Sequence, residues 1–363
     1  MSAAHPASDR VAAPEGAGAT ASRTESRTQS RAVKGRQVAR AEAVCAEPFL
    51  EEFVRPHLGA QARAGGGTWT TKVIQLDGTG AATVRVELGG RSPVFAKLFP
   101  FDDGPAVFGK LQALRSAGLG AGSRYQAVEP LAWYDREKVL LCRGAPGRAV
   151  SELLGGDPEV LTEGVAESGT WLGRLHSSSV RLGRPQSLLV TGELTSLAKR
   201  LSKVAADNPG YLDTALGMLE RLDRLTLDTV DGLVAQSHGQ YRPIHVFTTP
   251  EVVTVIDLDR SAPADPARDV AEFLHRLRLG VHGATGDITA ADAPCAAFLA
   301  AYREAVGRAD LLANLPFHWA RYVFHSLNRK VKTGEVGAAR PEDDTYRLYR
   351  EEFDRVVDGR ALA

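Results

Sequence analysis

The sequence contains few cysteines, no long apolar run and no net charge. Its 363 residues include only Cys45, Cys142 and Cys295, which share no short spacing. Neither a disulfide framework nor a zinc site is therefore indicated. No apolar stretch approaches the length that spans a bilayer, and the N-terminus lacks the apolar core of a secretory signal. The cysteine pattern makes a reducing cytoplasm the default expectation, with no membrane partner. The formal net charge of zero gives no reason to expect nucleic acid as the main partner.

Large apolar residues are also scarce in residues 1–40, which are mainly Ala, Ser, Thr and Arg. Such a segment cannot bury enough surface to fold, so we expect a disordered tail. A transit peptide has a similar composition, but Asp9, Glu15 and Glu25 count against that alternative. The whole sequence is 44% hydrophobic and 24% charged, as in ordinary globular proteins, so we expect the rest of the chain to fold around a sizeable core.

The most informative stretch runs from residue 237 to residue 260 and reads SHGQYRPIHVFTTPEVVTVIDLDR. Apolar runs at 246–247 and 252–256 flank a segment with turn composition, and a polar loop lies on each outer side. Two short strands joined by that turn would bring both polar loops to one edge of the hairpin. We expect the functional site at this edge.

This stretch resembles the catalytic segment of aminoglycoside phosphotransferases and choline kinases. That family has the pattern H-G-D-x-x-x-x-N, a hairpin, I-D and then D-P-x-x-D. Here His238-Gly239, Ile256-Asp257 and residues 265–269 match in order and spacing. The resemblance implies an α+β fold of the bilobal protein-kinase type, with a small antiparallel-sheet N-lobe and a larger helical C-lobe. We place these lobes at residues 41–143 and 144–363.

Two positions depart from the family pattern. Gln240 stands where the resemblance implies the catalytic aspartate, and His245 stands where it implies a metal-binding asparagine. An amide can orient a hydroxyl but cannot take its proton. Imidazole suits Mn²⁺ or Zn²⁺ better than Mg²⁺, and when protonated it could instead bond a phosphate. The resemblance implies that Asp257 is retained as a hard carboxylate ligand for Mg²⁺ or Mn²⁺.

Neighbouring side chains are candidates to compensate for the missing base. Asp259 could orient the acceptor, although a structural or metal-adjacent carboxylate is an equal alternative. Arg242 or Arg260 could neutralise the transferred phosphate, although ordinary loop salt bridges would also explain these two arginines. The candidate catalytic residues are therefore Gln240, Asp259 and Arg242, and the candidate metal ligands are Asp257 and His245.

The sequence from residue 69 to residue 99 predicts a sheet that could hold a nucleotide. Strand patterns cover residues 69–76, 82–88 and 94–99, and a glycine-containing turn at 77–80 joins the first two. Such a turn lets backbone N–H groups approach phosphates, although it is also a common tight turn. The resemblance implies that Lys97 holds the α- and β-phosphates of ATP or another nucleoside triphosphate. It also implies that the backbone of the hinge between the two lobes, near residues 141–143, bonds the adenine. The candidate nucleotide contacts are Gly78, Gly80, Lys97, Leu141 and Cys142.

One carboxylate that the resemblance implies is missing. In the family, a glutamate on the helix after the strand lysine pairs with that lysine, but no glutamate occurs between Lys97 and Glu129. Lys110 or Gln112 occupies the nearest place on a helix expected at 106–116. Five aspartates between residues 207 and 231 either contact a cationic acceptor or form a solvated helix face. His176 and Asp269 are expected to be structural, the latter by bonding the backbone of the catalytic loop.

Two functions remain open. The first is an ATP-dependent phosphotransferase that acts on a hydroxyl of a small molecule, or of a peptide, with Lys97 and Asp257 as its retained core. The second is a pseudokinase-like module that binds a nucleotide or another ligand and transfers nothing. The three missing family residues favour the second function, whereas the polar replacements at 240–245 favour the first, which we prefer. The sequence does not indicate an oligomeric state.

Overall fold

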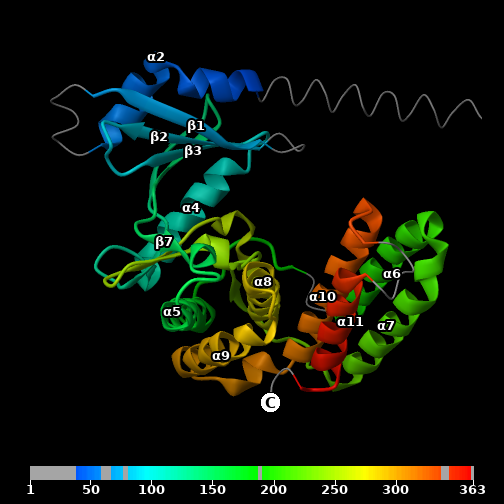
Figure 1. Ribbon diagram of the computed structural model, residues 1–363. Helices are drawn as coiled ribbons and strands as arrows, with labels where there is room; N and C mark the ends of the chain where they lie inside the picture. Colours follow the sequence, from blue (N-terminus) through cyan, green and yellow to red (C-terminus); the bar gives the residue numbers. More distant parts are fainter. Residues whose placement is uncertain (1–37, 59–66, 77–80, 187–189, 337–342, 361–363) are drawn as a thin grey trace, which may run out of the picture. The chain divides into compact units, whose positions relative to one another are not determined.

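The computed structural model describes residues 38–58, 67–76, 81–186, 190–336 and 343–360. By contacts the chain divides into two units (Figure 1). Unit 1 contains the described residues up to Gly104 and Trp133–Leu141, and unit 2 contains Pro105–Ala132 and the described residues from Cys142 onward. The division assigns Pro105–Ala132 to unit 2, whereas the sequence-based boundary placed it in the N-lobe; that boundary stays a prediction. The tail expected at 1–40 lies outside the described residues, apart from its last three positions.

Unit 1 is built on an antiparallel sheet. Its first strands are β1 (Trp69–Leu76), β2 (Ala82–Leu88) and β3 (Val94–Leu98), which confirms all three predicted strands. The sheet continues from β3 to β6 (Val139–Arg143) and then to β5 (Pro130–Tyr134). Every second residue of β2 is buried, because one face of the strand packs into the core.

The segment before the sheet is a broken helix. A first helix covers residues 38–45, and α2 (Glu47–Phe49), a π-helical turn (Leu50–Val54) and a 3₁₀ turn (Arg55–His57) follow. Two prolines explain the breaks, because a proline has no N–H to donate to the preceding helical turn. Apolar residues recur at helical spacing between residues 41 and 58, a pattern typical of one helix; the segment is helical, but the helix is not continuous.

Small strands in unit 2 carry the polar loops. The order β4 (Tyr125–Ala127), β10 (Val253–Val255), β9 (Val246–Thr248) and β7 (Arg148–Ala149) forms one sheet, and β8 (Ala235–Ser237) pairs with β11 (Ala262–Ala264). β9 and β10 form an antiparallel hairpin with Val253 opposite Thr248. This confirms the hairpin predicted from the two apolar runs.

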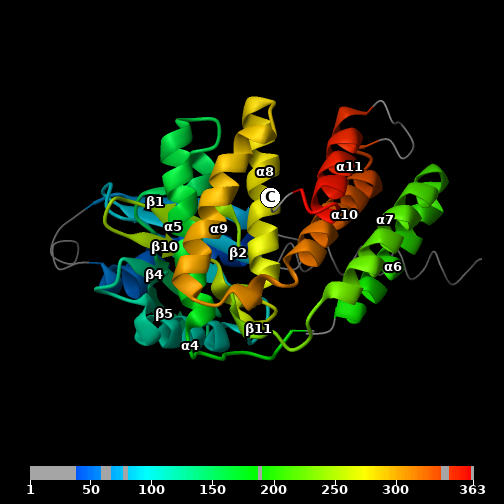
Figure 2. The ribbon, with the colours of Figure 1, turned by 90° about the horizontal axis from the view of Figure 1, so that it is seen from below.

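The helices of unit 2 form two groups that α8 and α10 join (Figure 2). Contacts pair α5 with α9, and α6 with α7. α5 and α9 approach so closely that a Cβ at Gly169 would lie 2.4 Å from the carbonyl oxygen of Phe298. None of the described helices is both long and apolar enough to cross a membrane. The helices are α4 (Gly104–Leu114), α5 (Pro158–Ser177), α6 (Val190–Asp207), α7 (Leu212–Leu225), α8 (Ala267–Thr285), α9 (Asp292–Val306), α10 (Leu315–Thr333) and α11 (Asp344–Val357).

A buried histidine at the α8–α10 contact makes the stability of the fold depend on pH. His275 is 2% exposed, and its Nε2 lies 2.7 Å from the hydroxyl of Ser326. Burial, followed by the charge of Arg276, lowers the pKa of His275 to about 3. In the unfolded chain the pKa of a histidine is about 6.5, so only the unfolded state gains a proton as the pH falls through this window.

We therefore expect the free energy of unfolding to be highest above pH 6.5 and to fall towards pH 3, with His275 contributing about 1.4 kcal/mol per pH unit. Urea unfolding at pH 7.5, 6 and 5 measures this slope. His275→Gln should reduce the slope relative to the wild type. Equal slopes for the two proteins would contradict the assignment.

Candidate functional site

A buried carboxylate holds the loop that follows β8. Asp269, in the first turn of α8, accepts hydrogen bonds from the backbone N–H of His238 at 2.6 Å and of Gly239 at 3.0 Å. Its Oδ2 also lies 3.4 Å from Nε2 of His176. Burial alone would raise the pKa of Asp269, but the hydrogen bond and charge of His176 and the backbone N–H of His238 lower it. The structural roles expected for Asp269 and His176 are confirmed.

Gly239 brings this loop against the backbone of the second polar loop. Its φ is +86°, and a Cβ added there would lie 2.5 Å from the carbonyl oxygen of Arg260. Only glycine adopts this conformation at low cost and leaves space for the carbonyl group. The close approach explains why a glycine follows His238.

Gly239→Ala is expected to lower the free energy of unfolding by at least about 1–2 kcal/mol, because the left-handed backbone and the clash both act against a Cβ. Gly217, inside α7, has no atom within 4 Å of its added Cβ. Gly217→Ala should therefore stabilise the protein by about 0.5–1 kcal/mol through helix propensity. Chemical denaturation of both variants measures the two changes in the free energy of unfolding. Changes of the same sign would contradict the prediction.

The hairpin brings the two polar loops together, as the sequence predicted. The Nε2 atom of His238 lies 2.9 Å from the carbonyl oxygen of Ile256, and the backbone N–H of Ile256 donates to the carbonyl of His245 at 3.0 Å. The side chain of His245 then reaches the second loop, where its Nε2 lies 3.5 Å from Oδ2 of Asp257. Asp257 and His245, the two candidate metal ligands, are therefore neighbours.

The hydrogen bonds of His245 determine its tautomer. Its Nδ1 lies 2.9 Å from the carbonyl oxygen of Gln240, and a carbonyl only accepts, so Nδ1 carries the proton. Burial, followed by the charge of His238, lowers the pKa of His245 to about 4. At neutral pH its Nε2 thus presents a lone pair to the carboxylate of Asp257. Two acceptor atoms that face each other in this way suit a divalent cation and do not suit the protonated-histidine alternative.

Asp257 has an unusual backbone conformation. Its φ of 64° and ψ of 43° lie in the left-handed region, and Lys138 is the other non-glycine residue with positive φ in the described chain. This conformation costs about 1–2 kcal/mol for most residues with a Cβ, and less for aspartate or asparagine, which adopt it more often. Such strain persists where the surrounding structure requires one side-chain direction. Here the side chain is 34% exposed and directed at His245.

The donor atoms present fit a metal that arrives with a nucleotide. Among the described residues, no group of three His, Cys, Asp or Glu side chains could hold a metal by itself. Mg²⁺ commonly takes only one or two protein carboxylates and completes its shell with water and phosphate oxygens. Asp257 provides one such carboxylate, and the neutral imidazole of His245 would favour Mn²⁺ as an alternative.

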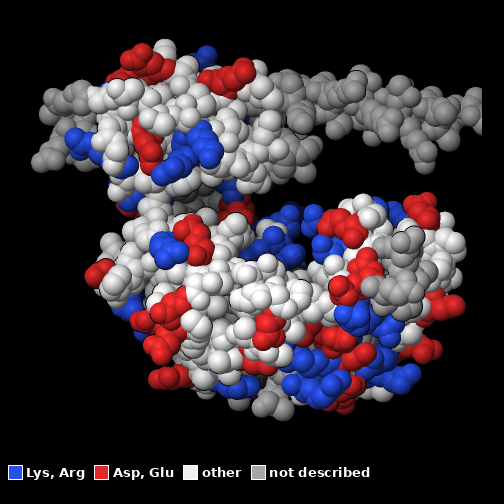
Figure 3. All heavy atoms as spheres, viewed as in Figure 1, with Lys and Arg blue, Asp and Glu red and all other residues white. Residues whose placement is uncertain are grey.

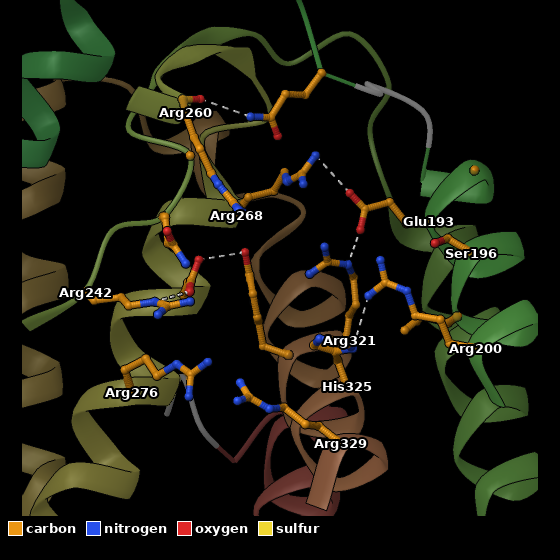
Figure 4. Close-up of a pocket in the computed structure, with 17 residues that line it drawn as sticks. Glu193, Ser196, Arg200, Arg242, Arg260, Arg268, Arg276, Arg321, His325 and Arg329 are labelled. Atoms are coloured by element: carbon orange, nitrogen blue, oxygen red, sulfur yellow. Dashed lines mark hydrogen bonds and ion pairs between the residues drawn. The ribbon is translucent and has the colours of Figure 1, made fainter. Parts of the chain in front are cut away.

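A cavity of about 450 Å³ lies beside this loop and is lined by residues of unit 2, including Gly239 and Gln240 (Figure 4). We call it the arginine pocket, because seven arginines line it against two glutamates, Glu193 and Glu272. Figure 3 shows Lys and Arg side chains gathered around a hollow of unit 2 between α8 and α10. The seven are Arg200, Arg242, Arg260, Arg268, Arg276, Arg321 and Arg329.

The sequence interpretation missed this pocket. A signal was present, because Arg268 and Arg276 are eight residues apart on α8, and Arg321 and Arg329 are eight apart on α10, so each pair lies on one helix face. The five aspartates that were weighed as contacts for a cationic acceptor are exposed and do not line the pocket. They are Asp207, Asp213, Asp223, Asp228 and Asp231.

Arg242 connects the loop that follows β8 to the arginine pocket. Its Nε donates to Oε1 of Glu272 at 2.6 Å. With the side-chain amide of Gln240 turned so that its oxygen faces Arg242, that oxygen accepts from Nη2 of Arg242 at 2.6 Å. Arg242 therefore holds the side chain of Gln240, and Glu272 holds Arg242.

The profile of the phosphotransferase enzyme family matches residues 72–323 of this sequence. The match covers more than half of the chain. The chain belongs to the phosphotransferase enzyme family. No curated protein sequence matches it. The family resemblance inferred from the catalytic segment is thereby confirmed.

Solved structures similar to this phosphotransferase-family chain share its fold at low identity. Choline kinase from Cryptosporidium parvum Iowa II is 10% identical with a TM-score of 0.58, covering 87% of this chain and 98% of that chain. A thermostable mutant of aminoglycoside phosphotransferase APH(4)-Ia is 14% identical with a TM-score of 0.54, covering 81% and 96%. Glucosamine kinase is 16% identical with a TM-score of 0.54, covering 86% of each chain. The expected α+β, protein-kinase-like fold is confirmed.

Lys110 is one of the two residues nearest to the place of the missing family glutamate, and it bonds the backbone of another loop. From α4 its Nζ donates to the backbone carbonyls of Asp259 at 3.0 Å and Ser261 at 2.6 Å. Burial lowers the pKa of Lys110, and the charge of Asp259 opposes that effect. A lysine can donate three hydrogen bonds, so Lys110 joins α4 to the loop after Asp257. The sequence did not predict this contact.

The candidate nucleotide contacts are distributed along the chain. Lys97 lies on β3 opposite Thr83 of β2. Leu141 is buried on β6, and Cys142 beside it is half-buried. Gly78 and Gly80 lie outside the described residues. Nucleotide binding by these residues stays a prediction.

Proposed function

We propose that this protein transfers a phosphoryl group from ATP, or another nucleoside triphosphate, to a hydroxyl of a small molecule. The observation that carries the proposal is the strained backbone of Asp257, which directs a carboxylate at the Nε2 lone pair of His245, 3.5 Å away. If this carboxylate had no function, glycine at position 257 would make the protein more stable. The strain therefore supports a functional role for Asp257.

Asp257, with His245 beside it, would hold Mg²⁺ or Mn²⁺. Such a metal, when bound, neutralises charge on the phosphate oxygens. Lys97 would contact the α- and β-phosphates, the backbone of Leu141 and Cys142 would bond the base, and the turn with Gly78 and Gly80 would cover the phosphates. These assignments follow the family pattern.

In the proposed reaction the oxygen of the acceptor hydroxyl forms a bond to the γ-phosphorus. The bond between that phosphorus and the bridging oxygen of the β-phosphate breaks, and the nucleoside diphosphate leaves. Gln240 orients the hydroxyl but cannot take its proton, because an amide is not basic, so the proton passes to water. Base help contributes about 10²–10⁴ in rate, so transfer without it is slower but feasible.

Arg242 and Asp259 have supporting roles in this proposal. The guanidinium of Arg242 would neutralise charge on the transferred group, while its bond to Glu272 keeps it in place. Lys110 donates to the backbone carbonyl of Asp259, and the carboxylate of Asp259 would orient the acceptor.

The alternative is a pseudokinase-like protein that binds a nucleotide and transfers nothing. Gln240 in the place of the catalytic aspartate favours it, and so does the missing glutamate, because Lys110 on the same helix bonds loop carbonyls instead. Thermal-shift titration with ATP in Mg²⁺, Mn²⁺ or EDTA, followed by assays of nucleoside diphosphate release, separates the two. Metal-dependent binding without release for any acceptor would support the pseudokinase, and no metal-dependent binding would refute the enzyme.

A further inference from the structure

We propose that the arginine pocket binds an anionic acceptor, a small molecule that carries a phosphate monoester or a comparable oxyanion besides the hydroxyl that is phosphorylated. This inference rests on the proposed phosphotransferase function, because Gly239 and Gln240 of the catalytic loop line the same pocket. The oxyanion would lie against the arginines of α8 and α10, and the hydroxyl would lie towards Gln240.

The lining of the pocket has a large excess of positive charge. Seven arginines and two glutamates give a formal excess of five charges. Burial, followed by the charges of Arg200 and Arg321, lowers the pKa of His325 to about 4, so this histidine is neutral at pH 7. A hollow lined by one sign of charge focuses its field and raises the local concentration of counter-ions. A cationic acceptor would be repelled.

The two glutamates already have arginine partners. Glu193, whose side chain is 9% exposed, pairs with Nη1 of Arg268 at 3.0 Å and with Nε of Arg321. Glu272 pairs with Arg242. Within the described part of the chain, the other arginines of the pocket form no ion pair with a carboxylate. They are Arg200, Arg260, Arg276 and Arg329.

Arg276 is the strongest single indication of an anion. Its Nε is buried and has no hydrogen-bond partner among the described residues. Figure 4 shows its guanidinium group and that of Arg329 pointing into the same part of the pocket. Two guanidinium groups on packed helices repel each other unless an anion lies between them, and their planar donors match the geometry of phosphate oxygens.

The dimensions of the pocket indicate a small ligand. About 450 Å³ lies within the usual range of about 300–1,000 Å³ for small-molecule sites. Three helices contribute the lining, α6 through Ser196 and Arg200, α8 through Arg268 and Arg276, and α10 through Arg321 and His325. Tyr322 and His325 carry the aromatic rings among the described lining residues, and most of the others are charged or polar, so the ligand is held mainly by charge and hydrogen bonds.

The test titrates the full chain with millimolar inorganic phosphate at constant ionic strength, by calorimetry and thermal shift. The wild type should bind phosphate, and the double variant Arg276→Gln/Arg329→Gln should bind at least about tenfold more weakly. The control is Arg224→Gln/Arg347→Gln, whose arginine side chains are 73% and 57% exposed on other helices. The control should bind like the wild type. Should the double variant not fold, Arg200→Gln, at an exposed residue on α6, has the same expected direction.

Equal phosphate binding by the wild type and the Arg276/Arg329 variant, or no binding by either, would overturn the proposal. So would an equal loss in the control, since that is a general ionic effect. Repeating the titration with saturating ADP and Mg²⁺ tests whether the pocket instead holds a phosphate of the nucleotide. Phosphate binding that persists supports an acceptor site, whereas its loss would make the pocket part of the nucleotide site and refute the proposal. Failure of the proposed function is distinct, because it appears as missing metal-dependent ATP binding with phosphate binding unchanged.

Discussion

Asp257→Asn is expected to remove metal-dependent nucleotide binding and to lower phosphoryl transfer by at least about 10²- to 10³-fold, the loss typical for one electrostatic group aimed at developing charge. Asparagine has the shape of aspartate and tolerates the left-handed backbone, but its amide is uncharged. The variant should therefore unfold at nearly the same denaturant concentration as the wild type. Thermal-shift titration with ATP and Mg²⁺ or Mn²⁺, with an assay of ADP release, measures the effect.

Two comparisons make this result specific. Asp259→Asn, two residues away, should leave metal dependence intact, since Asp259 contacts Lys110 through its backbone carbonyl. Asp257→Gly should raise the free energy of unfolding by about 1 kcal/mol, because glycine adopts the left-handed conformation without strain. If Asp257→Asn kept its metal dependence while Asp259→Asn lost it, Asp259 would be the metal ligand and the assignment of Asp257 would be wrong.

Asp269→Ala is expected to lower the free energy of unfolding by about 3–5 kcal/mol. Removing the carboxylate leaves the N–H groups of His238 and Gly239 without their acceptor, and it removes the Asp269 contact of Nε2 of the buried His176. Urea unfolding measures the loss. Asp223→Ala, at an exposed aspartate of α7, is the control and should change stability by less than about 0.5 kcal/mol.

The pH dependence separates the charge of Asp269 from its shape. The folded-state pKa of Asp269 is lowered, so its stabilising contribution is present above the unfolded value of about 3.9 and is lost as the pH falls through the folded value. The wild type should therefore exceed Asp269→Asn in stability at pH 7, and the difference should shrink below about pH 4. A difference that stays constant down to pH 3 would assign the effect to hydrogen-bond geometry alone.

Local patterns were sufficient to predict the elements that carry the site. The strand pattern in residues 82–88 predicted β2. Asp157 followed by proline is a typical helix start, and α5 begins there with the Asp157 carboxylate accepting from the backbone N–H of Glu159 at 2.8 Å. The hairpin at 246–255 and the structural role of Asp269 were also predicted. Each of these features depends on strand or helix periodicity, on a helix cap, or on a motif of short spacing. Such patterns are formed by residues that are close together in the sequence.

The sequence by itself determined the family, the strands of residues 69–99, and the two loops that meet at the hairpin, because each is encoded within about thirty consecutive residues. Only the tertiary structure decided the chemistry around those loops. Lys110 bonds a carbonyl 149 positions away, burial keeps His245 neutral, and the packing of α6, α8 and α10 gathers seven arginines around one pocket. Charge and burial act through space, so residues far apart in the sequence set the pKa values and the ligand preference of the site.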